Sequence, residues 1–171
     1  PLGTIAIRDT LNVFVIPEGY TPKIGGRIMS LQDPSKKMSK SDENENAFIT
    51  LLDSPDVIRQ KMKRAVTDSG KEVYSDASKP GVSNLLTIFS AVTNKPINTL
   101  EQEYRDGGYG KFKTDIAEAI IEFLKPIQNR YHELRHDQTM LLKILRHGAE
   151  QANDRANKTL VKAKTAIGFI G

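Results

Sequence analysis

The stretch KKMSKSDENENAF, residues 36–48, sets three lysines within five positions and separates them with serines and a methionine. Each lysine carries a compact positive charge with three hydrogen-bond donors, which suits phosphate oxygens. On charge alone, the ordinary interpretation of such a cluster is a solvated surface patch. The small spacers favour a second interpretation, a mobile cationic loop that closes over a triphosphate and stabilises the charge that grows as pyrophosphate leaves.

Positive charge is concentrated in the first 71 residues. The whole chain has a net charge of +4, and each of the segments 21–41 and 59–71 alone carries five basic residues and one acidic residue. The rest of the chain is therefore net acidic, and the basic part is suited to nucleotides or nucleic acid. Cysteine is absent, which excludes disulfides and thiolate metal sites. No apolar run reaches the length of a membrane span, so we expect a cytoplasmic protein.

The elements around the lysines differ in character. The apolar run of residues 13–16 predicts a short buried strand, and the polar, glycine-containing stretch after it predicts an exposed loop with a brief strand at 28–31. Residues 55–66 predict a helix, because Ser54 is suited to cap it and its apolar residues share one face. Residues 67–80 are rich in turn formers and predict a linker.

From residue 81 onward the pattern predicts a helical bundle. Amphipathic segments cover 82–92 and 96–104, a longer one begins near 111, and Asp137 is suited to cap the last. Pro126 should kink or interrupt the longer helix. Its last turns and the final helix carry basic and aromatic side chains that could contact RNA phosphates and unpaired bases, or could simply be solvated. They are Arg130, Tyr131, His132, Arg135, His136, Arg146, Arg155, Lys158, Lys162 and Lys164.

The five residues Lys37-Met38-Ser39-Lys40-Ser41 are an unbroken copy of the KMSKS signature of class I aminoacyl-tRNA synthetases. The surrounding text narrows this likeness, and the chain resembles the carboxy-terminal part of a bacterial-type tryptophanyl-tRNA synthetase. The stretches that carry the resemblance are TPKIGGRIMSLQDPSKKMSKSD, KMKRAVTDS, KPGVSNLL, YGKFK and RANKTL.

The resemblance implies a mainly α fold in two parts. Residues 1–66 would be the KMSKS-loop end of a Rossmann-type α/β catalytic domain, most of which is missing. Residues 67–80 would be a linker, and residues 81–171 a helical anticodon-binding domain. The family dimerises, so a homodimer is expected of the intact enzyme.

The resemblance also implies a reaction. In the family, ATP and L-tryptophan form tryptophanyl-adenylate with release of pyrophosphate, and the amino acid is then transferred to tRNA(Trp). Magnesium accompanies the ATP, and no tightly bound cofactor or protein metal site is expected. Lys37 and Lys40 would act on the β- and γ-phosphates. The full set of expected ATP-binding residues is Ile28, Met29, Lys37, Met38, Ser39, Lys40 and Ser41.

The chain departs from the family in its first residues. The other class I signature, His-x-Gly-His, is absent, and the three histidines lie at positions 132, 136 and 147. The segment that shapes the amino-acid pocket survives only as fragments such as Arg8-Asp9, and PLGT at the start could be a tag scar or a broken end. We therefore expect the 171 residues alone to be inactive. The alternatives are a nonenzymatic helical RNA-binding module and a tyrosyl-tRNA synthetase fragment.

Overall fold

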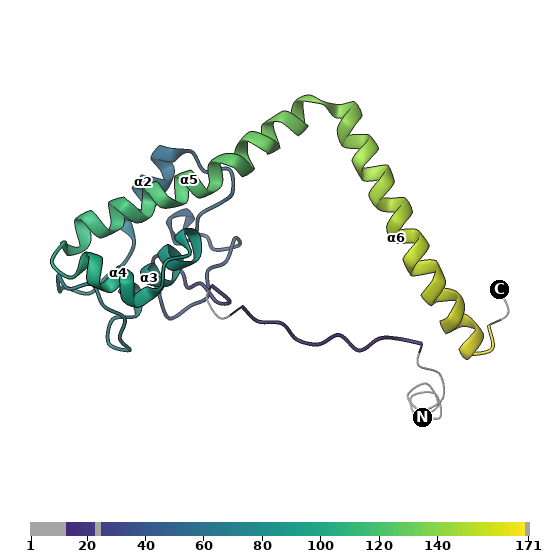
Figure 1. The fold of residues 1–171 in the computed structure, drawn as a ribbon, viewed down its shortest axis with the longest axis horizontal. Coiled ribbons are helices and arrows are strands. Elements are labelled where there is room, and N and C mark those ends of the chain that lie inside the picture. The colour runs from purple at the N-terminus through teal and green to yellow at the C-terminus, as the bar shows by residue number, and fades with distance from the viewer. Residues whose placement is uncertain (1–12, 23–24, 170–171) are drawn as a thin grey trace. The chain divides into compact units, whose positions relative to one another are not determined.

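The computed structural model describes residues 13–22 and 25–169, and the described part is helical. The elements are a short 3₁₀ helix η1 (Glu45–Ala47) and the α-helices α2 (Pro55–Arg64), α3 (Pro80–Thr93), α4 (Ile97–Tyr104), α5 (Gly108–His136) and α6 (Gln138–Ala166) (Figure 1). Residues 21–131 form one compact unit, whereas residues 132–169 belong to a second. The mainly helical character predicted for the second half of the chain is confirmed.

Two predicted helix starts are confirmed by their caps. The Ser54 side chain accepts a hydrogen bond from the Val57 N–H at the start of α2, and Asp137 accepts from the Met140 N–H at the start of α6. Helix α2 ends at Arg64, two residues before the predicted end. The main chain becomes extended there because the N–H of residue 66 donates to the Leu31 carbonyl at 2.7 Å, outside any helix.

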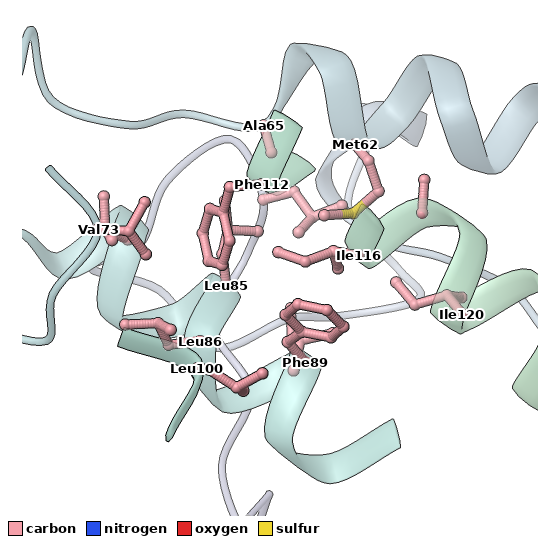
Figure 2. Packing of buried hydrophobic residues seen from close by; sticks show 14 of the residues in the cluster. Met62, Ala65, Val73, Leu85, Leu86, Phe89, Leu100, Phe112, Ile116 and Ile120 are labelled. Carbon is pink, nitrogen blue, oxygen red and sulfur yellow. The ribbon is translucent and has the colours of Figure 1, made fainter. Parts of the chain in front are cut away.

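The core of residues 21–131 lies where α2, α3, α4 and the first half of α5 meet (Figure 2). Phe89, Tyr104 and Phe112 come from three different helices, and their ring centroids lie 5.4 to 6.2 Å apart in tilted and edge-on arrangements that suit aromatic quadrupoles. Met62 of α2 and Leu100 of α4 are fully buried beside them. This core fixes the positions of the segments that carry the candidate site.

Gly81 lets the first turn of α3 lie directly against the segment that follows α2. A Cβ atom at this position would lie 2.3 Å from the Val66 carbonyl oxygen, a distance that no real contact tolerates. Any larger residue would therefore push α3 away from residues 66–67, which are the backbone next to the end of α2.

Both predicted strands differ from the structure. Residues 13–16 form no strand, and Val15 is 93% exposed, so the prediction of a buried strand is wrong. A strand is stable only when a neighbour pairs with its N–H and C=O groups, and within the described residues no strand pairs with this run. At 28–31 the structure has a single bridge between Met29 and Lys37 rather than a strand.

Helix α5 runs through Pro126 without a break, so the interruption that was one of the two predicted outcomes does not occur, and a kink at Pro126 stays a prediction. Proline has a helical φ and removes one hydrogen bond from the helix. The carbonyl that loses its donor belongs to Glu122, which is an exposed residue. No parallel sheet is present in the described part of residues 1–66, and the Rossmann-type character of that segment stays a prediction. The fragments Leu2-Gly3 and Arg8-Asp9 lie outside the described residues.

Candidate functional site

Two hydrogen bonds from α3 hold the start of the lysine loop, our name for residues 28–42. The Met29 N–H donates to Asn84 Oδ1 at 2.8 Å, and Asn84 Nδ2 donates to the Met29 carbonyl at 2.8 Å. The Asn84 side chain therefore binds both main-chain groups of Met29, as a neighbouring strand would. Asn84 is only 6% exposed, and the two bonds satisfy an amide that burial would otherwise leave without partners.

Main-chain hydrogen bonds then close the loop on itself and attach it to the core. The Ser30 N–H donates to the Lys36 carbonyl at 2.9 Å, and the Met38 N–H donates to the Ile28 carbonyl at 3.0 Å. Leu31, which is buried, donates its N–H to the Ala47 carbonyl at 2.9 Å. The segment 28–38 is thus a narrow closed loop with fixed ends.

Asp33 organises the tip of this loop and takes up the charge of one lysine. Its carboxylate accepts from both the N–H and the hydroxyl of Ser35 and forms an ion pair with Lys36 Nζ at 3.0 Å. The hydrogen bonds from Ser35, followed by that from Lys36, hold the pKa of Asp33 below its usual range. Of the three clustered lysines, Lys36 is therefore already paired within the loop.

Lys37 and Lys40 remain available to a ligand. Both are exposed, and neither has an ion pair or side-chain hydrogen bond to any residue in the described part of the chain. Lys40 lies inside a turn that the Asp42 N–H closes by donating to the Ser39 carbonyl at 3.2 Å, and the Ser39 hydroxyl accepts from the Ser41 N–H. Two ammonium groups on a backbone of small residues can donate to phosphate oxygens.

The apolar residues among those expected to bind ATP are on two different sides of the loop. Ile28 and Met38 pack against the core and line an apolar cavity of about 180 Å³ between the loop, α3 and α5. Met29 instead lines a separate cavity together with Arg27 and Asn84. This split follows from the alternation of side chains along extended backbone.

Two cations of α2 form ion pairs that attach the helix to neighbouring segments. Arg59 donates from Nε and Nη2 to the two carboxylate oxygens of Glu118 on α5, at 2.6 and 3.1 Å, and pairs with Asp56 as well. Lys61 is buried and pairs with Asp53 at 2.6 Å. Of the four cations of α2, Arg59 and Lys61 are therefore paired with carboxylates in the described residues, whereas Lys63 and Arg64 are not.

Asp68 belongs to a structural network rather than to the lysine loop. It accepts from the Tyr109 hydroxyl at 2.8 Å, from the Gly70 N–H at 2.6 Å and from Lys79 Nζ at 3.4 Å. The hydrogen bond from Tyr109 contributes most to a lowered pKa of Asp68. The network ties the residues after α2 to the start of α5, and Asp68 lies beyond the end of α2 rather than terminating it.

The residues after the lysines form the cap of η1. The N-cap of η1 is Asn44, whose side chain accepts from the Asn46 N–H. Asp42 accepts from the Asn44 N–H at 2.9 Å. Its side chain therefore binds the backbone of the N-cap residue and is not itself the cap of η1.

The side chains expected to contact RNA are exposed at the end of α5 and along α6. Helix α6 contains no buried residue, and its charged residues other than histidine are six basic and two acidic. A helix with this surplus can attract a polyanion. The structure assigns none of these residues a specific nucleotide contact.

The described residues contain no group of three or more His, Asp or Glu side chains placed to hold a metal ion. None of their helices is both long and apolar enough to cross a membrane.

Sequence reasoning did not identify Asn84 or Lys113. Asn84 holds the loop, and Lys113 donates from Nζ to the Ala65 carbonyl at 2.8 Å. Asn84 was a polar residue inside an apolar helical segment. Both residues lie in stretches that carry the family resemblance, KPGVSNLL and YGKFK, but neither stretch indicates the contact that its residue makes.

Comparison with known proteins places this geometry in a family. The family model described as tRNA synthetases class I (W and Y) matches residues 3–125. The tryptophan–tRNA ligase of Bacillus subtilis is 54% identical over 159 residues, which cover 92% of this chain and 48% of the relative. That of Clostridium perfringens is 48% identical over 170 residues, which cover 99% of this chain and 51% of the relative.

A solved structure agrees with the sequence comparison. The tryptophanyl-tRNA synthetase of Mycoplasma pneumoniae matches with a TM-score of 0.77 at 32% identity, over 88% of this chain and 45% of that chain. The chain thus spans about half the length of the relatives that it matches. With the family model matching well over half of its residues, the chain belongs to the class I tRNA synthetases of the tryptophan and tyrosine group.

Proposed function

We propose that this chain is the part of a tryptophan–tRNA ligase that carries the phosphate-binding lysine loop and the tRNA-binding helices. The single observation that carries the proposal is the pair Lys37 and Lys40, exposed and without an ion pair in the described residues, on a loop whose ends are fixed to the core. The named relatives at about half identity are tryptophan enzymes, which favours tryptophan over tyrosine as the amino acid.

In the proposed reaction, Lys37 and Lys40 donate hydrogen bonds to the β- and γ-phosphates of ATP. The turn at Ser39 and Ser41 presents both ammonium groups, and fixed donors stabilise the negative charge that develops on pyrophosphate as it leaves. Magnesium would arrive with ATP, whose phosphates it neutralises. Ile28 and Met38, which line the apolar cavity beneath the loop, would lie toward adenosine. Met29 would lie on the opposite side of the loop.

The proposal divides the chain at the residues after α2. Residues 1–66 would form the end of the catalytic domain, 67–80 the connection and 81–171 the part that binds the anticodon region of tRNA(Trp). The surplus of basic residues on α6 supports an RNA partner. A homodimer and a cytoplasmic location of the intact enzyme complete the proposal.

Activity of the lysine loop is tested by tryptophan-dependent ATP–pyrophosphate exchange. The chain alone has no His-x-Gly-His motif, and we expect no exchange from it. Addition of the amino-terminal half of the Bacillus subtilis relative, produced separately, should restore exchange. In that mixture Lys37→Ala and Lys40→Ala should each reduce the rate roughly 10²- to 10³-fold.

The matched control for this assay is Lys36→Ala, because Lys36 is a neighbouring lysine that already pairs with Asp33. It should change the exchange rate only a few-fold. Exchange by the chain alone, or equal losses from all three lysine variants, would contradict the proposal.

Binding of RNA is tested with a tryptophan tRNA transcript and the same transcript with its anticodon replaced. Tighter binding of the native transcript by the full chain would support anticodon recognition within residues 81–171. Equal binding of both transcripts would leave only a general RNA-binding module, and no binding would remove the RNA partner from the proposal for this chain.

A further inference from the structure

Two lysines between α2 and α5 differ from the other cations of this surface. Arg59 is paired with the carboxylates of Glu118 and Asp56. Lys63 is exposed and has no ion pair or side-chain hydrogen bond within the described part of the chain. Lys113 is half-buried, and within the same residues its hydrogen-bond partner is the neutral Ala65 carbonyl rather than a carboxylate. Two positive charges therefore remain without a counter-ion.

Both lysines line the same cavity. It has a volume of about 500 Å³ and is bounded by side chains of α2 and the first turns of α5. Gly110 contributes no side chain, and a Cβ atom at this position would meet nothing within 4 Å. The hydroxyl of Thr114 donates to the Gly110 carbonyl at 2.9 Å, so this hydroxyl proton is already used. The cations of the cavity wall that no carboxylate pairs within the described residues are Lys63 and Lys113.

The half-buried ammonium favours an anion in the cavity. Burial lowers the pKa of Lys113 because desolvation penalises the charged form. Its hydrogen bond to the Ala65 carbonyl uses one of its three donors. An anion that accepts from the remaining donors, with Lys63 beside it, would offset the cost of desolvating the charge.

We propose that this cavity is a phosphate-binding site and that it takes a backbone phosphate of RNA. Phosphate matches the compact charge of lysine ammonium groups, and a phosphodiester carries no base identity. The site would therefore position RNA without reading its sequence. The RNA source of the phosphate rests on the proposed function, whereas the anion site itself rests on the cavity and its two uncompensated lysines.

The first test measures binding of the full chain to the tryptophan tRNA transcript over a range of salt concentrations. Lys63→Ala should weaken binding and reduce the slope of log K against log salt by about 1. The native and the anticodon-replaced transcripts should lose the same factor, because the contact is to backbone. Lys125→Ala is the matched control, since Lys125 is an exposed lysine of α5 outside this cavity. An unchanged salt slope for Lys63→Ala would overturn the RNA contact.

Lys113→Met tests the second lysine by removing the charge and keeping an apolar stem. Its thermal unfolding is followed alongside, because loss of the bond to the Ala65 carbonyl can destabilise the chain. A folded Lys113→Met chain should show the same loss of slope as Lys63→Ala. If it does not fold, Lys63→Ala decides the result, since Lys63 is exposed and forms no ion pair or side-chain hydrogen bond within the described residues.

The second test uses inorganic phosphate and separates this site from the proposed function. Titration of the ¹⁵N-labelled chain should shift the amides of residues 109–114, and Lys63→Ala should weaken that response. If wild type binds no RNA but the shifts occur, the anion site stands and the proposed RNA partner fails. If RNA binds with an unchanged slope in Lys63→Ala and inorganic phosphate shifts nothing, the cavity is no phosphate site.

Discussion

The segments 21–41 and 59–71, which contain most of the lysine loop and of α2, each carry five basic residues and one acidic residue, yet the fold uses their cations differently. On α2, Arg59 and Lys61 are bound by the carboxylates of Glu118 and Asp53. In the loop, only Lys36 is paired, through Asp33, and the two other lysines of the KMSKS run are exposed.

The difference shows that counting charges along a sequence does not measure the positive field that a ligand meets. A buried cation that pairs with a carboxylate contributes to packing. The carboxylate offsets its charge at close range, so the pair adds little to the positive field that a ligand meets. Lys61 has a side chain only 8% exposed, whereas that of Lys36 is 74% exposed. The lysines that no carboxylate holds are the ones that can act on a substrate.

The largest expected effect comes from breaking the buried pair. Lys61→Ala should lower the free energy of unfolding by about 3–5 kcal/mol, because it leaves the carboxylate of Asp53 partly buried without a counter-ion. Urea denaturation measures this value. Lys63→Ala, two positions away and exposed, should change it by less than about 0.5 kcal/mol. Similar losses in both variants would break the distinction between structural and available cations.

Removal of the amide that holds the loop should come next. Asn84→Ala deletes both hydrogen bonds to the Met29 main chain and should cost about 2–3 kcal/mol, because a partly buried N–H and C=O lose their partners. Hydrogen exchange at the Met29 amide should become faster in the same variant. Asn98→Ala is the control, since Asn98 is exposed and bonds only the adjacent N–H. An unchanged exchange rate at Met29 would show that the loop does not depend on α3.

Acid should weaken the attachment of α2 through Asp53. Burial raises the pKa of Asp53, but hydrogen bonds from Lys61 and Thr50 outweigh it and keep the pKa below the ordinary 3.8. A lowered folded-state pKa means that the carboxylate stabilises the chain above the unfolded value and loses this contribution as pH falls toward the folded value. Between about pH 5 and pH 3, Asp53→Asn should therefore lose less stability than wild type. Parallel pH profiles would contradict this role.

The smallest expected effect on stability belongs to the candidate catalytic lysines. Lys37→Ala and Lys40→Ala should each change the free energy of unfolding by less than about 0.5 kcal/mol, because no ion pair in the described residues is lost. Thermal or urea unfolding checks this. A loss above about 1 kcal/mol would mean that these lysines hold the loop in place, which would remove the main argument for their availability.

Local signals predicted the features that depend on neighbouring residues. The caps at Ser54 and Asp137 were predicted because each cap bonds an N–H three residues away. The strand predicted at 13–16 was wrong because a strand depends on a partner that the local pattern does not reveal. The bond between Asn84 and Met29 joins residues 55 positions apart, and no local pattern signals such a contact.

The sequence by itself determined the helical second half of the chain, the motif of the lysine loop and the likeness to the tryptophan enzymes. These features depend on residue order over a few turns of helix or on short motifs. Only the tertiary structure decided which cations are available. Asp33 pairs with Lys36 from three residues away, but Glu118 reaches Arg59 across 59 positions. Electrostatic pairing falls off with distance in space, and distance in space is set by the packed core rather than by position along the chain.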